Sequence, residues 1–395
     1  MSRIVITGLG IISAIGSNVA ENRLALIKST CGVTQLDLFS SRYAGVLPCG
    51  EIKFSTSELK ERLFANDPGI TRTTLLALHA FEEASKDCGL TADQLSADDT
   101  ALVAASTVGG MCLTDELYQD AHMVSGGSTF LSSYDCGSVA LYLRDRFNMR
   151  GIINTINTAC SSSANAIMYG ARLIKNGFAN RCIVGGTDSL AKFTLNGFNS
   201  MHILSRDLCT PFDLNRNGLN LGEGAAFLVL EKEEDAFDKR LYASLSGYGN
   251  ANDAFHPSSL SEDGEGPYLA MKAALATARL EPGQVDFINA HGTGTENNDE
   301  SESKAMLRLF PQPPPFASTK SNVGHTLGAA GAVQAVYSVL NLVQQEVYPS
   351  LHYTKPIPST GLQPVLKYAK MPLQHVMSNS FAFGGNCTSL IFSKA

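Results

Sequence analysis

The sequence contains no tryptophan, no long apolar run and no run of basic residues. No apolar stretch approaches the roughly 20 residues that a membrane-spanning helix needs. Lys and Arg number 30 against 37 Asp and Glu, which gives a net charge of −7. Proteins that bind nucleic acids usually carry basic clusters that meet the phosphates, so this balance argues against such a partner. We therefore expect neither membrane insertion nor nucleic-acid binding.

Motifs for metals and nucleotides are missing as well. The nine cysteines include no Cys-x-x-Cys pair, and the eight histidines are scattered without a His-x-x-x-His spacing. An odd number of cysteines in a long chain is typical of free thiols in a reduced compartment. No Gly-x-Gly-x-x-Gly turn follows a predicted strand, and no Walker-type loop occurs. We therefore expect no metal, no nucleotide and no other cofactor.

The sequence does contain ample material for a core. Of its 395 residues 44% are apolar and 17% are charged, a balance typical of a globular protein with two or three domains or one large duplicated domain. Its 35 glycines indicate close backbone packing. Short β-branched runs alternate with helical patterns, which predicts an α/β fold. The predicted strands are residues 3–7, 100–104, 181–184, 226–230 and 286–289.

The N-terminal segment could be mistaken for a secretory signal, because Arg3 precedes the apolar run IVITGLGIISAIG. Only one charge stands before this run, glycines interrupt it, and β-branched residues dominate it. These features favour a first core strand over a cleaved signal. We therefore expect a cytoplasmic protein.

Two strongly amphipathic helices are predicted to begin with a chemically active side chain. One begins at Cys160 and the other near His325, and both carry apolar residues at the 3.6-residue spacing. Each follows a short extended run and a turn of small residues. This similarity predicts two related halves, residues 1–240 and 241–395, each a sheet covered by helices.

Cys160 lies in the segment NTACSSS, where an extended run meets a helix. A helix N-terminus offers unpaired N–H groups and a positive dipole end, which favour a thiolate. The neighbouring serines leave little bulk around the sulfur. The alternative is a buried cysteine that acts as a small apolar side chain. The local sequence favours neither interpretation over the other.

Two histidines lie in loops of small residues. His291 follows a predicted strand in NAHGTGT, and His325 lies in KSNVGHTLGAAG. Such surroundings suit a ligand that comes close to the backbone. Lys320 precedes His325 by five residues, and its charge should keep a nearby imidazole neutral. The alternatives are a histidine that caps a sheet end, and a helix-start histidine beside a surface lysine.

Three further residues are candidates with a weaker basis. Phe383 in SFAFGGN is an aromatic residue beside two glycines, so it could be a movable plug over a pocket. From the sequence alone, a core aromatic at the end of a strand is the better interpretation. Asp299 and Glu302 lie just past the His291 loop. We expect them to hold that loop in place and not to take part in chemistry.

Together and in this order, the segments TACSSS, HGTGT…ND, STKSNVGHTLGAAG and SFAFGGN resemble the β-ketoacyl–acyl carrier protein synthases of the thiolase superfamily, of the elongating type with a Cys-His-His triad. The segments RIVITGLGIIS and PFDLNRNGLNLGEGAAFLVLE are similar too, so the resemblance covers nearly the whole chain. It implies a thiolase-like five-layer αβαβα fold built from two similar halves. It also implies acyl carrier protein as a partner, and a homodimer or a heterodimer with a homologous chain.

The resemblance implies a decarboxylative condensation without a cofactor. Cys160 would accept the acyl group from one carrier, and His291 and His325 would decarboxylate the malonyl group on another. Two neutral imidazoles suit that step, because each can donate a hydrogen bond to the enolate oxygen. Lys320 matches the lysine of the family pattern.

The resemblance also implies how substrates reach this centre. Thr293 and Thr295 would meet the pantetheine arm of the carrier. Phe383 would be a gate whose backbone N–H forms an oxyanion hole together with that of the nucleophile. Asp299 and Glu302 would be structural acids of the loop that precedes them. Acyl chain length, saturation and pathway stay open.

The sequence departs from the usual family pattern in two segments. GFGGTN reads AFGGNC here, so that Ala382, Asn386 and Cys387 are unusual, and we expect Ala382 to stiffen the gate because alanine resists a positive φ. RDGF reads RNGL at residues 216–219, which removes an acid and an aromatic near the entrance. The TACSSS and KSNVGH forms are closer to polyketide-type synthases than to those of fatty-acid synthesis.

Other functions of the same superfamily are also considered. A thiolase pairs one histidine with two cysteines, and Cys387 could be the second. An initiating synthase uses Cys-His-Asn, against which His325 argues. A silent chain-length partner of a synthase lacks the nucleophile, which is present here. For docking of an acidic carrier, the basic side chains Lys60, Arg62 and Arg72 are the candidates.

Overall fold

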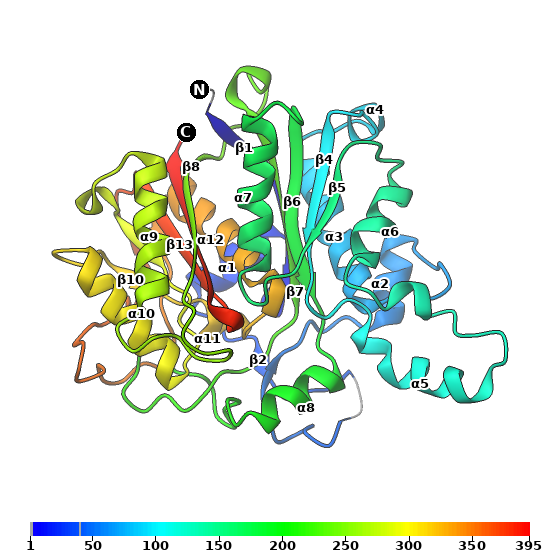
Figure 1. Ribbon diagram of the computed structural model, residues 1–395, viewed down its shortest axis with the longest axis horizontal. Coiled ribbons are helices and arrows are strands. Elements are labelled where there is room, and N and C mark those ends of the chain that lie inside the picture. Colours follow the sequence, from blue (N-terminus) through cyan, green and yellow to red (C-terminus); the bar gives the residue numbers. More distant parts are fainter. Residues whose placement is uncertain (1–2, 39–40) are drawn as a thin grey trace.

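One mixed sheet of ten strands runs through the computed structural model, which describes residues 3–38 and 41–395. Its strand order is β10-β9-β13-β14-β8-β1-β7-β6-β4-β5 (Figure 1). The first five strands along the chain that join it are β1 (Ile4–Ser13), β4 (Thr100–Ala105), β5 (Ile153–Ile156), β6 (Arg181–Asp188) and β7 (Gly224–Lys232). The other five are β8 (Ala243–Asn252), β9 (Phe287–Asn289), β10 (Phe316–Ala317), β13 (His375–Phe381) and β14 (Asn386–Lys394).

The sheet is built from one arrangement used twice. In the N-terminal half β1 pairs antiparallel with β7 and β7 antiparallel with β6, whereas β6, β4 and β5 are parallel. The strands β8, β14, β13, β9 and β10 repeat this order and these directions in the C-terminal half. The halves join where β1 pairs antiparallel with β8, at Val5–Ser244 and Ile6–Ala243. The prediction of two similar halves is therefore confirmed.

Helices form three layers around the two parts of the sheet. The helix α7 (Ser162–Lys175) packs against β6 and β4, α12 (Ala330–Gln344) packs against β13 and β7, and the two helices contact each other between the halves. The helix α3 (Arg72–Asp87) covers the outer face of the N-terminal half and α9 (Glu265–Ala278) that of the C-terminal half (Figure 1). This is the expected αβαβα arrangement. Because α7 of the N-terminal half contacts α12 of the C-terminal half, the loops that lead into these two helices lie close together.

The remaining elements surround this frame. The other helices are α1 (Val19–Ile27), α2 (Thr56–Leu63), α4 (Ala92–Leu95), α5 (Thr114–Met123), α6 (Ser138–Arg146), α8 (Lys192–Ser200), α10 (Glu296–Leu309) and α11 (Lys320–Val323). Two small antiparallel sheets pair β2 (Val33–Thr34) with β3 (Cys49–Gly50), and β11 (Glu346–Val347) with β12 (Ala369–Lys370).

All five predicted strands exist, but β1 is longer than predicted. It continues through the glycines to Ser13 and is buried throughout. A Cβ atom at Gly8 or Gly10 would overlap a backbone carbonyl oxygen of α3. The glycines therefore let α3 lie directly on the strand and do not interrupt it. The interpretation of this segment as a core strand is confirmed.

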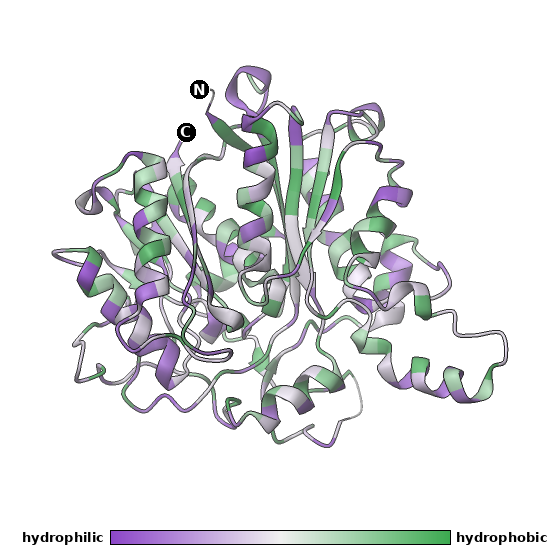
Figure 2. Ribbon diagram, in the orientation of Figure 1, coloured by the Kyte–Doolittle hydropathy of each residue, from purple (hydrophilic) through white to green (hydrophobic). Residues whose placement is uncertain are grey.

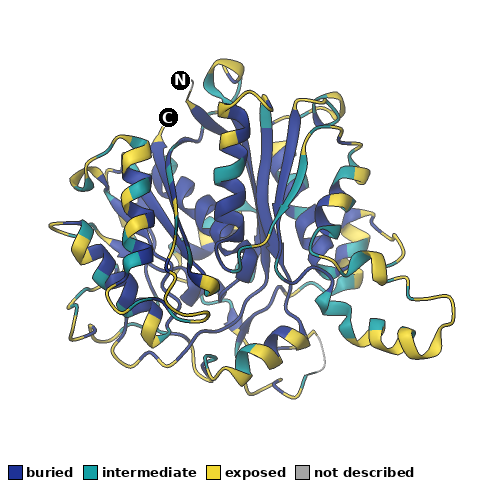
Figure 3. Ribbon diagram, viewed as in Figure 1, coloured by how far each residue is buried: buried dark blue, intermediate teal, exposed yellow. Residues whose placement is uncertain are grey.

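Burial follows the layers. Figure 3 shows the sheet strands almost entirely buried and α5 largely exposed, and in Figure 2 the strands of the N-terminal half carry long apolar stretches. Contrary to the expectation from the sequence, one helical segment in the described part of the chain, Leu327–Gln344, is long and apolar enough to cross a membrane. Because 89% of it is buried inside the protein, we interpret it as the core helix that α12 forms between the halves.

Candidate active site

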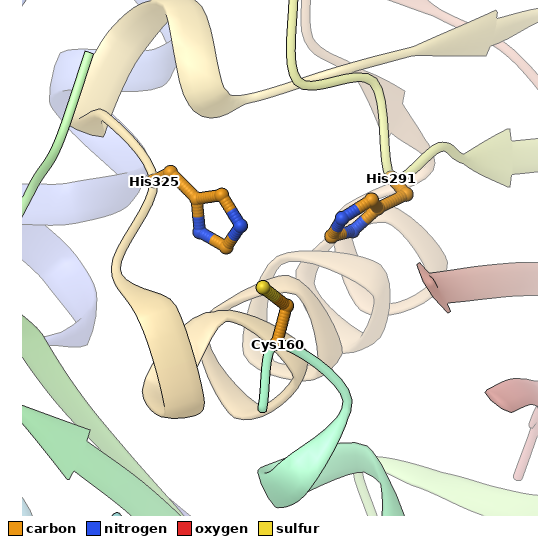
Figure 4. Close-up of side chains that lie close together, drawn as sticks. All are labelled: Cys160, His291 and His325. Atoms are coloured by element: carbon orange, nitrogen blue, oxygen red, sulfur yellow. The ribbon is translucent and has the colours of Figure 1, made fainter. Parts of the chain in front are cut away.

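Cys160, His291 and His325 meet where the two halves of the fold join. Their sulfur and ring-nitrogen atoms lie within 4.8 Å of one another, and all three residues are buried. Figure 4 shows the sulfur between the two imidazole rings, whose centroids are 5.4 Å apart and whose planes are nearly perpendicular, at 84°. The structure thus brings together the three residues that the motifs single out.

The backbone before α7 places the thiol of Cys160 in this cluster. The helix begins at Ser162, two residues later than predicted, and Ala159 has a positive φ of 51°. A positive φ is unusual for alanine and makes a tight turn immediately before the cysteine. The hydroxyl of Ser162 accepts a hydrogen bond from the N–H of Thr158 at 2.8 Å, which closes the turn.

Burial decides the resting state of the Cys160 thiol. It raises the pKa of the thiol to about 11, although the charge of Lys320 and the backbone N–H of Phe383 both act in the opposite direction. The helix N-terminus alone therefore does not make the thiolate the resting form at neutral pH, contrary to expectation. Desolvation of a buried anion outweighs the helix end here.

Hydrogen bonds fix the proton positions of both histidines. The backbone N–H of Leu327 lies 3.1 Å from Nδ1 of His325, and the ammonium of Lys320 lies 3.3 Å from Nδ1 of His291. Both partners can only donate, so each Nδ1 accepts and each neutral ring carries its proton on Nε2. Burial and then the charge of Lys320 hold the pKa of both rings well below the usual range. Two neutral rings with Nε2–H donors result.

Lys320 is buried beside the histidines and is not a surface lysine. Its ammonium donates to the carbonyl oxygen of His291 and, at 2.9 Å, to Oε1 of Gln334. Burial lowers its pKa to about 8, so the side chain is still mostly protonated at neutral pH. Sequence analysis did not identify Gln334. The available signal was an amide among the apolar residues of the first turns of this helix.

The two acids hold the His291 loop, as predicted. Glu302 accepts hydrogen bonds from the N–H groups of His291 and Gly292, each at 2.9 Å. Asp299 accepts from the N–H of Thr293 at 2.9 Å and from that of Phe212 at 2.7 Å. Burial raises the pKa of Glu302 to about 7 and also raises that of Asp299. Neither acid lines the cavity next to the thiol.

A cavity of about 370 Å³ connects this cluster to the surface. Thr293 and Thr295 line it, with their hydroxyl oxygens 2.9 Å apart, and Phe383 lines it opposite the nucleophile turn. The ring of Phe383 is half-buried and stacks on Phe198, with centroids 6.0 Å apart and planes at 22°. The interpretation of Phe383 as a core aromatic is therefore wrong. Its ring borders the cavity and not the core.

Two expectations about the unusual residues of the gate segment are corrected. Ala382 has φ −117° and ψ 156°, an extended conformation that alanine adopts freely, so it does not strain the segment. The positive φ values belong to Gly384 and Gly385. Cys387 is buried in β14, packs with Phe381, which lines the cavity, and does not itself line it. It therefore lacks the position that a second thiolase cysteine would need.

The proposed docking residues separate into two groups. Arg72 is largely enclosed, with 12% of its side chain exposed, and forms two hydrogen bonds with Glu223, from Nη2 at 2.6 Å and from Nε at 2.9 Å. This pairing already engages its charge, which argues against the expected role in docking. Arg62 is exposed and Lys60 is half-buried, both on α2. These two stay as predicted candidates.

The cluster of one thiol and two imidazoles also has the composition of a metal site. Such side chains are common zinc ligands. Here, however, the ammonium of Lys320 lies 3.3 Å from one ring of the cluster, and a dication would be placed close to this buried positive charge. The charge distribution therefore favours an anionic ligand over a metal ion.

A duplicated mixed sheet, with a thiol and two neutral imidazoles where its halves meet, defines a condensing enzyme of the thiolase fold. Comparison with known proteins is consistent with this class. Residues 1–236 match the family described as beta-ketoacyl synthase, N-terminal domain, and residues 242–354 match its C-terminal domain. The chain belongs to the β-ketoacyl synthase family, as its motifs indicate.

Individual relatives match over the full length. A putative mitochondrial 3-oxoacyl-[acyl-carrier-protein] synthase of Schizosaccharomyces pombe is 33% identical, over 100% of this chain and 99% of the relative. The solved ishigamide ketosynthase/chain length factor superposes with a TM-score of 0.93 at 29% identity, covering 100% of this chain and 99% of that one. A ketosynthase solved with its type II polyketide acyl-carrier protein superposes with a TM-score of 0.89 at 25% identity, with complete coverage of both chains.

Proposed function

We propose that this chain catalyses the decarboxylative Claisen condensation of an acyl thioester with malonyl-acyl carrier protein. The observation that carries the proposal is the pair of buried neutral imidazoles, each with an Nε2–H, beside the Cys160 thiol. A thiol accounts for acyl transfer. Two hydrogen-bond donors aimed at one place account for stabilisation of a developing enolate.

The reaction begins with transfer of the acyl group to Cys160. The sulfur attacks the thioester carbon of the acyl-carrier, and the carbon–sulfur bond to the pantetheine thiol breaks. The thiol proton of Cys160 passes to the departing pantetheine sulfur, so charge and protons balance. Lys320 and the N–H of Phe383 stabilise the negative sulfur while it forms, since both lower the pKa of this thiol.

Decarboxylation then generates the carbon nucleophile. The bond between the α-carbon and the carboxylate of the malonyl group breaks, CO2 leaves, and the electron pair moves onto the thioester oxygen. The Nε2–H groups of His291 and His325 donate to that oxygen. The α-carbon attacks the acyl carbon on Cys160, the carbon–sulfur bond breaks, and the departing thiolate takes up a proton from water to regenerate the resting thiol. The β-ketoacyl product stays on the carrier.

The remaining residues of the cavity serve binding and entry. Thr293 and Thr295 present neighbouring hydroxyls along the cavity and suit the amide groups of the pantetheine arm. Phe383 gates the path, supported by the stacking on Phe198 and the two positive-φ glycines that follow it. Asp299 and Glu302 keep the loop of His291 in place.

We further propose an acyl carrier protein as the partner and a dimer as the working form. The names of the relatives support this: one is a ketosynthase in complex with its carrier and another is a ketosynthase/chain length factor. The second subunit is either identical or a homologous chain. The cytoplasm is the proposed location, and the boundary between the two halves is placed at residue 240, in the connection from β7 to β8.

A paired assay tests the assignment. Acyl-enzyme is measured by intact mass after mixing with an acyl-carrier, and CO2 release is measured with labelled malonyl-carrier. We expect His291→Ala and His325→Ala to form acyl-enzyme but to lose decarboxylation at least about a hundredfold. We expect Cys160→Ala to lose acylation and to retain some decarboxylation. Normal CO2 release from both histidine variants would contradict the proposal.

A further inference from the structure

The first residue of β14, Asn386, lies at the centre of a polar network that links two chain segments far apart in the sequence. Its Oδ1 accepts hydrogen bonds from Nδ2 of Asn165 at 2.8 Å and from Nδ2 of Asn250 at 2.9 Å. The hydroxyl of Ser161 lies at 2.8 Å from the same oxygen. Ser161 and Asn165 belong to the start of α7, whereas Asn386 directly follows the turn Phe383–Gly385.

In this network the Asn386 amide presents its carbonyl oxygen to the NH2 groups of Asn165 and Asn250. An amide oxygen can accept more than one hydrogen bond, so a single atom can serve both partners. One oxygen thus holds the turn after β13 to the residue next to Cys160 and to the first turn of its helix. A second link within the network joins Nδ2 of Asn165 to the hydroxyl of Thr158 at 2.8 Å, just before the nucleophile.

The two segments that Asn386 joins meet at the cavity, which both Cys160 and Phe383 line. The backbone N–H groups of Phe383 and of Cys160 itself both lower the pKa of the Cys160 thiol, so both stabilise negative charge at this point. When a thiolate attacks a thioester, the carbonyl oxygen gains its charge within one bond of the attacked carbon and hence close to that sulfur. Donors placed there in advance are the groups that stabilise such an oxyanion.

These donors come from separate segments, so their spacing depends on whatever holds the segments together. Backbone bonds tie the Phe383 turn to the loop on its other side, through Gly384 N–H to the carbonyl of Pro257 at 2.7 Å and Asp253 N–H to that of Gly385 at 2.8 Å. Toward α7, the hydrogen bonds among the described residues run through the side chain of Asn386 and, two residues farther along β14, from the hydroxyl of Thr388 to Oδ1 of Asn165 at 2.8 Å.

We propose that Asn386 is a positioning residue that sets the spacing of the two oxyanion-binding N–H groups during acyl transfer to Cys160. This inference rests on the proposed acyl transfer. It concerns a residue at which this chain differs from the usual family pattern, where threonine stands. The amide of asparagine extends one atom farther than a hydroxyl and can accept from several donors at once.

The proposal separates two reactions of the same sulfur. Acyl transfer passes through an oxyanion and needs both N–H groups. Alkylation of the thiolate by iodoacetamide is a direct displacement at carbon and forms no oxyanion. A residue that positions the oxyanion donors should therefore affect the first reaction and spare the second, whereas general damage to the nucleophile turn should slow both.

The test compares Asn386→Leu, which removes the acceptor at similar volume, with Asn386→Asp, which retains an acceptor oxygen. Asn386→Ala provides the same deletion with less bulk if leucine impairs folding. Asn250→Ala is the matched control, because it removes one partner of Asn386, together with the bond from Asn250 to Oδ1 of Asn165 at 3.1 Å, and leaves the contacts of Asn386 with Ser161 and Asn165. For each, single-turnover acylation by an acyl-carrier and alkylation by iodoacetamide are measured, together with the melting temperature.

We expect Asn386→Leu and Asn386→Ala to acylate at least about tenfold more slowly while alkylation stays within about threefold of the wild type. Asn386→Asp and Asn250→Ala should acylate within about threefold. Unchanged acylation in the deletion variants, or a parallel fall of both reactions, would overturn the proposal. If wild-type Cys160 accepts no acyl group from a carrier or from a small acyl thioester, the proposed function itself fails, and that outcome is visible without any variant.

Discussion

Replacement of Lys320 by methionine should shift the pH dependence of decarboxylation. The ammonium lies 3.3 Å from Nδ1 of His291, and both groups are buried. After burial itself, this charge is the main reason that the pKa of His291 lies well below its usual value, and it acts on His325 in the same sense. Removing the cation makes protonation of both rings easier, so their pKa values should rise.

The size of the shift follows from the separation of the charges. Two unit charges about 4 Å apart interact by about 4 kcal/mol at the effective dielectric constant of roughly 20 that suits protein sites. This energy is large compared with the roughly 1.4 kcal/mol that corresponds to one pKa unit, so the pKa of His291 should rise clearly when the cation is removed. Lys320 is mostly protonated in the acidic part of the range, where the histidines would gain protons, because its own pKa is about 8.

The assay is CO2 release from labelled malonyl-carrier between about pH 5 and pH 8, normalised to the maximum of each variant. Protonated rings cannot serve as a neutral donor pair. Activity of Lys320→Met should therefore fall at a higher pH on acidification than that of the wild type. Lys304→Met, which removes a partly exposed lysine paired with Glu300, is the control and should leave the profile unchanged. Coinciding normalised profiles for Lys320→Met and the wild type would refute the electrostatic argument.

Three further predictions follow from the structure. Because burial raises the pKa of Cys160 to about 11, its alkylation by iodoacetamide should accelerate about tenfold per pH unit above neutrality, and a plateau near pH 7 would contradict this. Phe383→Ala should disturb the order of acyl loading and malonyl entry but cost less than the roughly 3–5 kcal/mol of a buried phenylalanine in urea unfolding, whereas normal loading with a loss of that size would place its ring in the core. Arg72→Met should cost about 3–5 kcal/mol in the same unfolding experiment because it leaves Glu223 buried and unpaired, whereas Lys86→Met, on the exposed face of the same helix, should change stability by less than about 0.5 kcal/mol.

The meeting of Cys160, His291 and His325 in one site was predictable from the sequence because these residues lie in distinctive local segments. Cys160, His291 and His325 each follow or precede a turn of small residues, and the order of these turns indicates the family. Fold class followed from the same resemblance. The alternation of buried strands and amphipathic helices gave only the α/β part of that prediction, because periodicity carries no information about which strands pair.

Contacts between distant segments could not be predicted in this way. Gln334 accepts a hydrogen bond from Lys320 only because the fold brings these two side chains together, and a polar residue within a mainly apolar helix does not by itself indicate its partner. Arg72 was taken for an exposed basic residue. Its burial depends on Glu223, 151 positions away, which supplies the compensating charge. The location of a charged side chain is thus decided by tertiary pairing.

The same limit applies to the gate segment. Its glycines indicated mobility, but the sequence did not reveal that Ala382 is extended or that Phe383 stacks on Phe198. Backbone conformation at a single residue and the meeting of two aromatic rings both depend on the complete fold. The structure was therefore needed to assign this segment to the cavity wall.

One measurement tests the central claim most directly. The wild type and Cys160→Ala are incubated with an acyl-carrier and malonyl-carrier, and the carrier is analysed by intact mass together with peptide mapping of the enzyme. The wild type should yield a β-ketoacyl-carrier and should carry the acyl intermediate on Cys160, while Cys160→Ala yields neither. Product formation by Cys160→Ala, or an acyl intermediate on another cysteine with Cys160 free, would contradict the account.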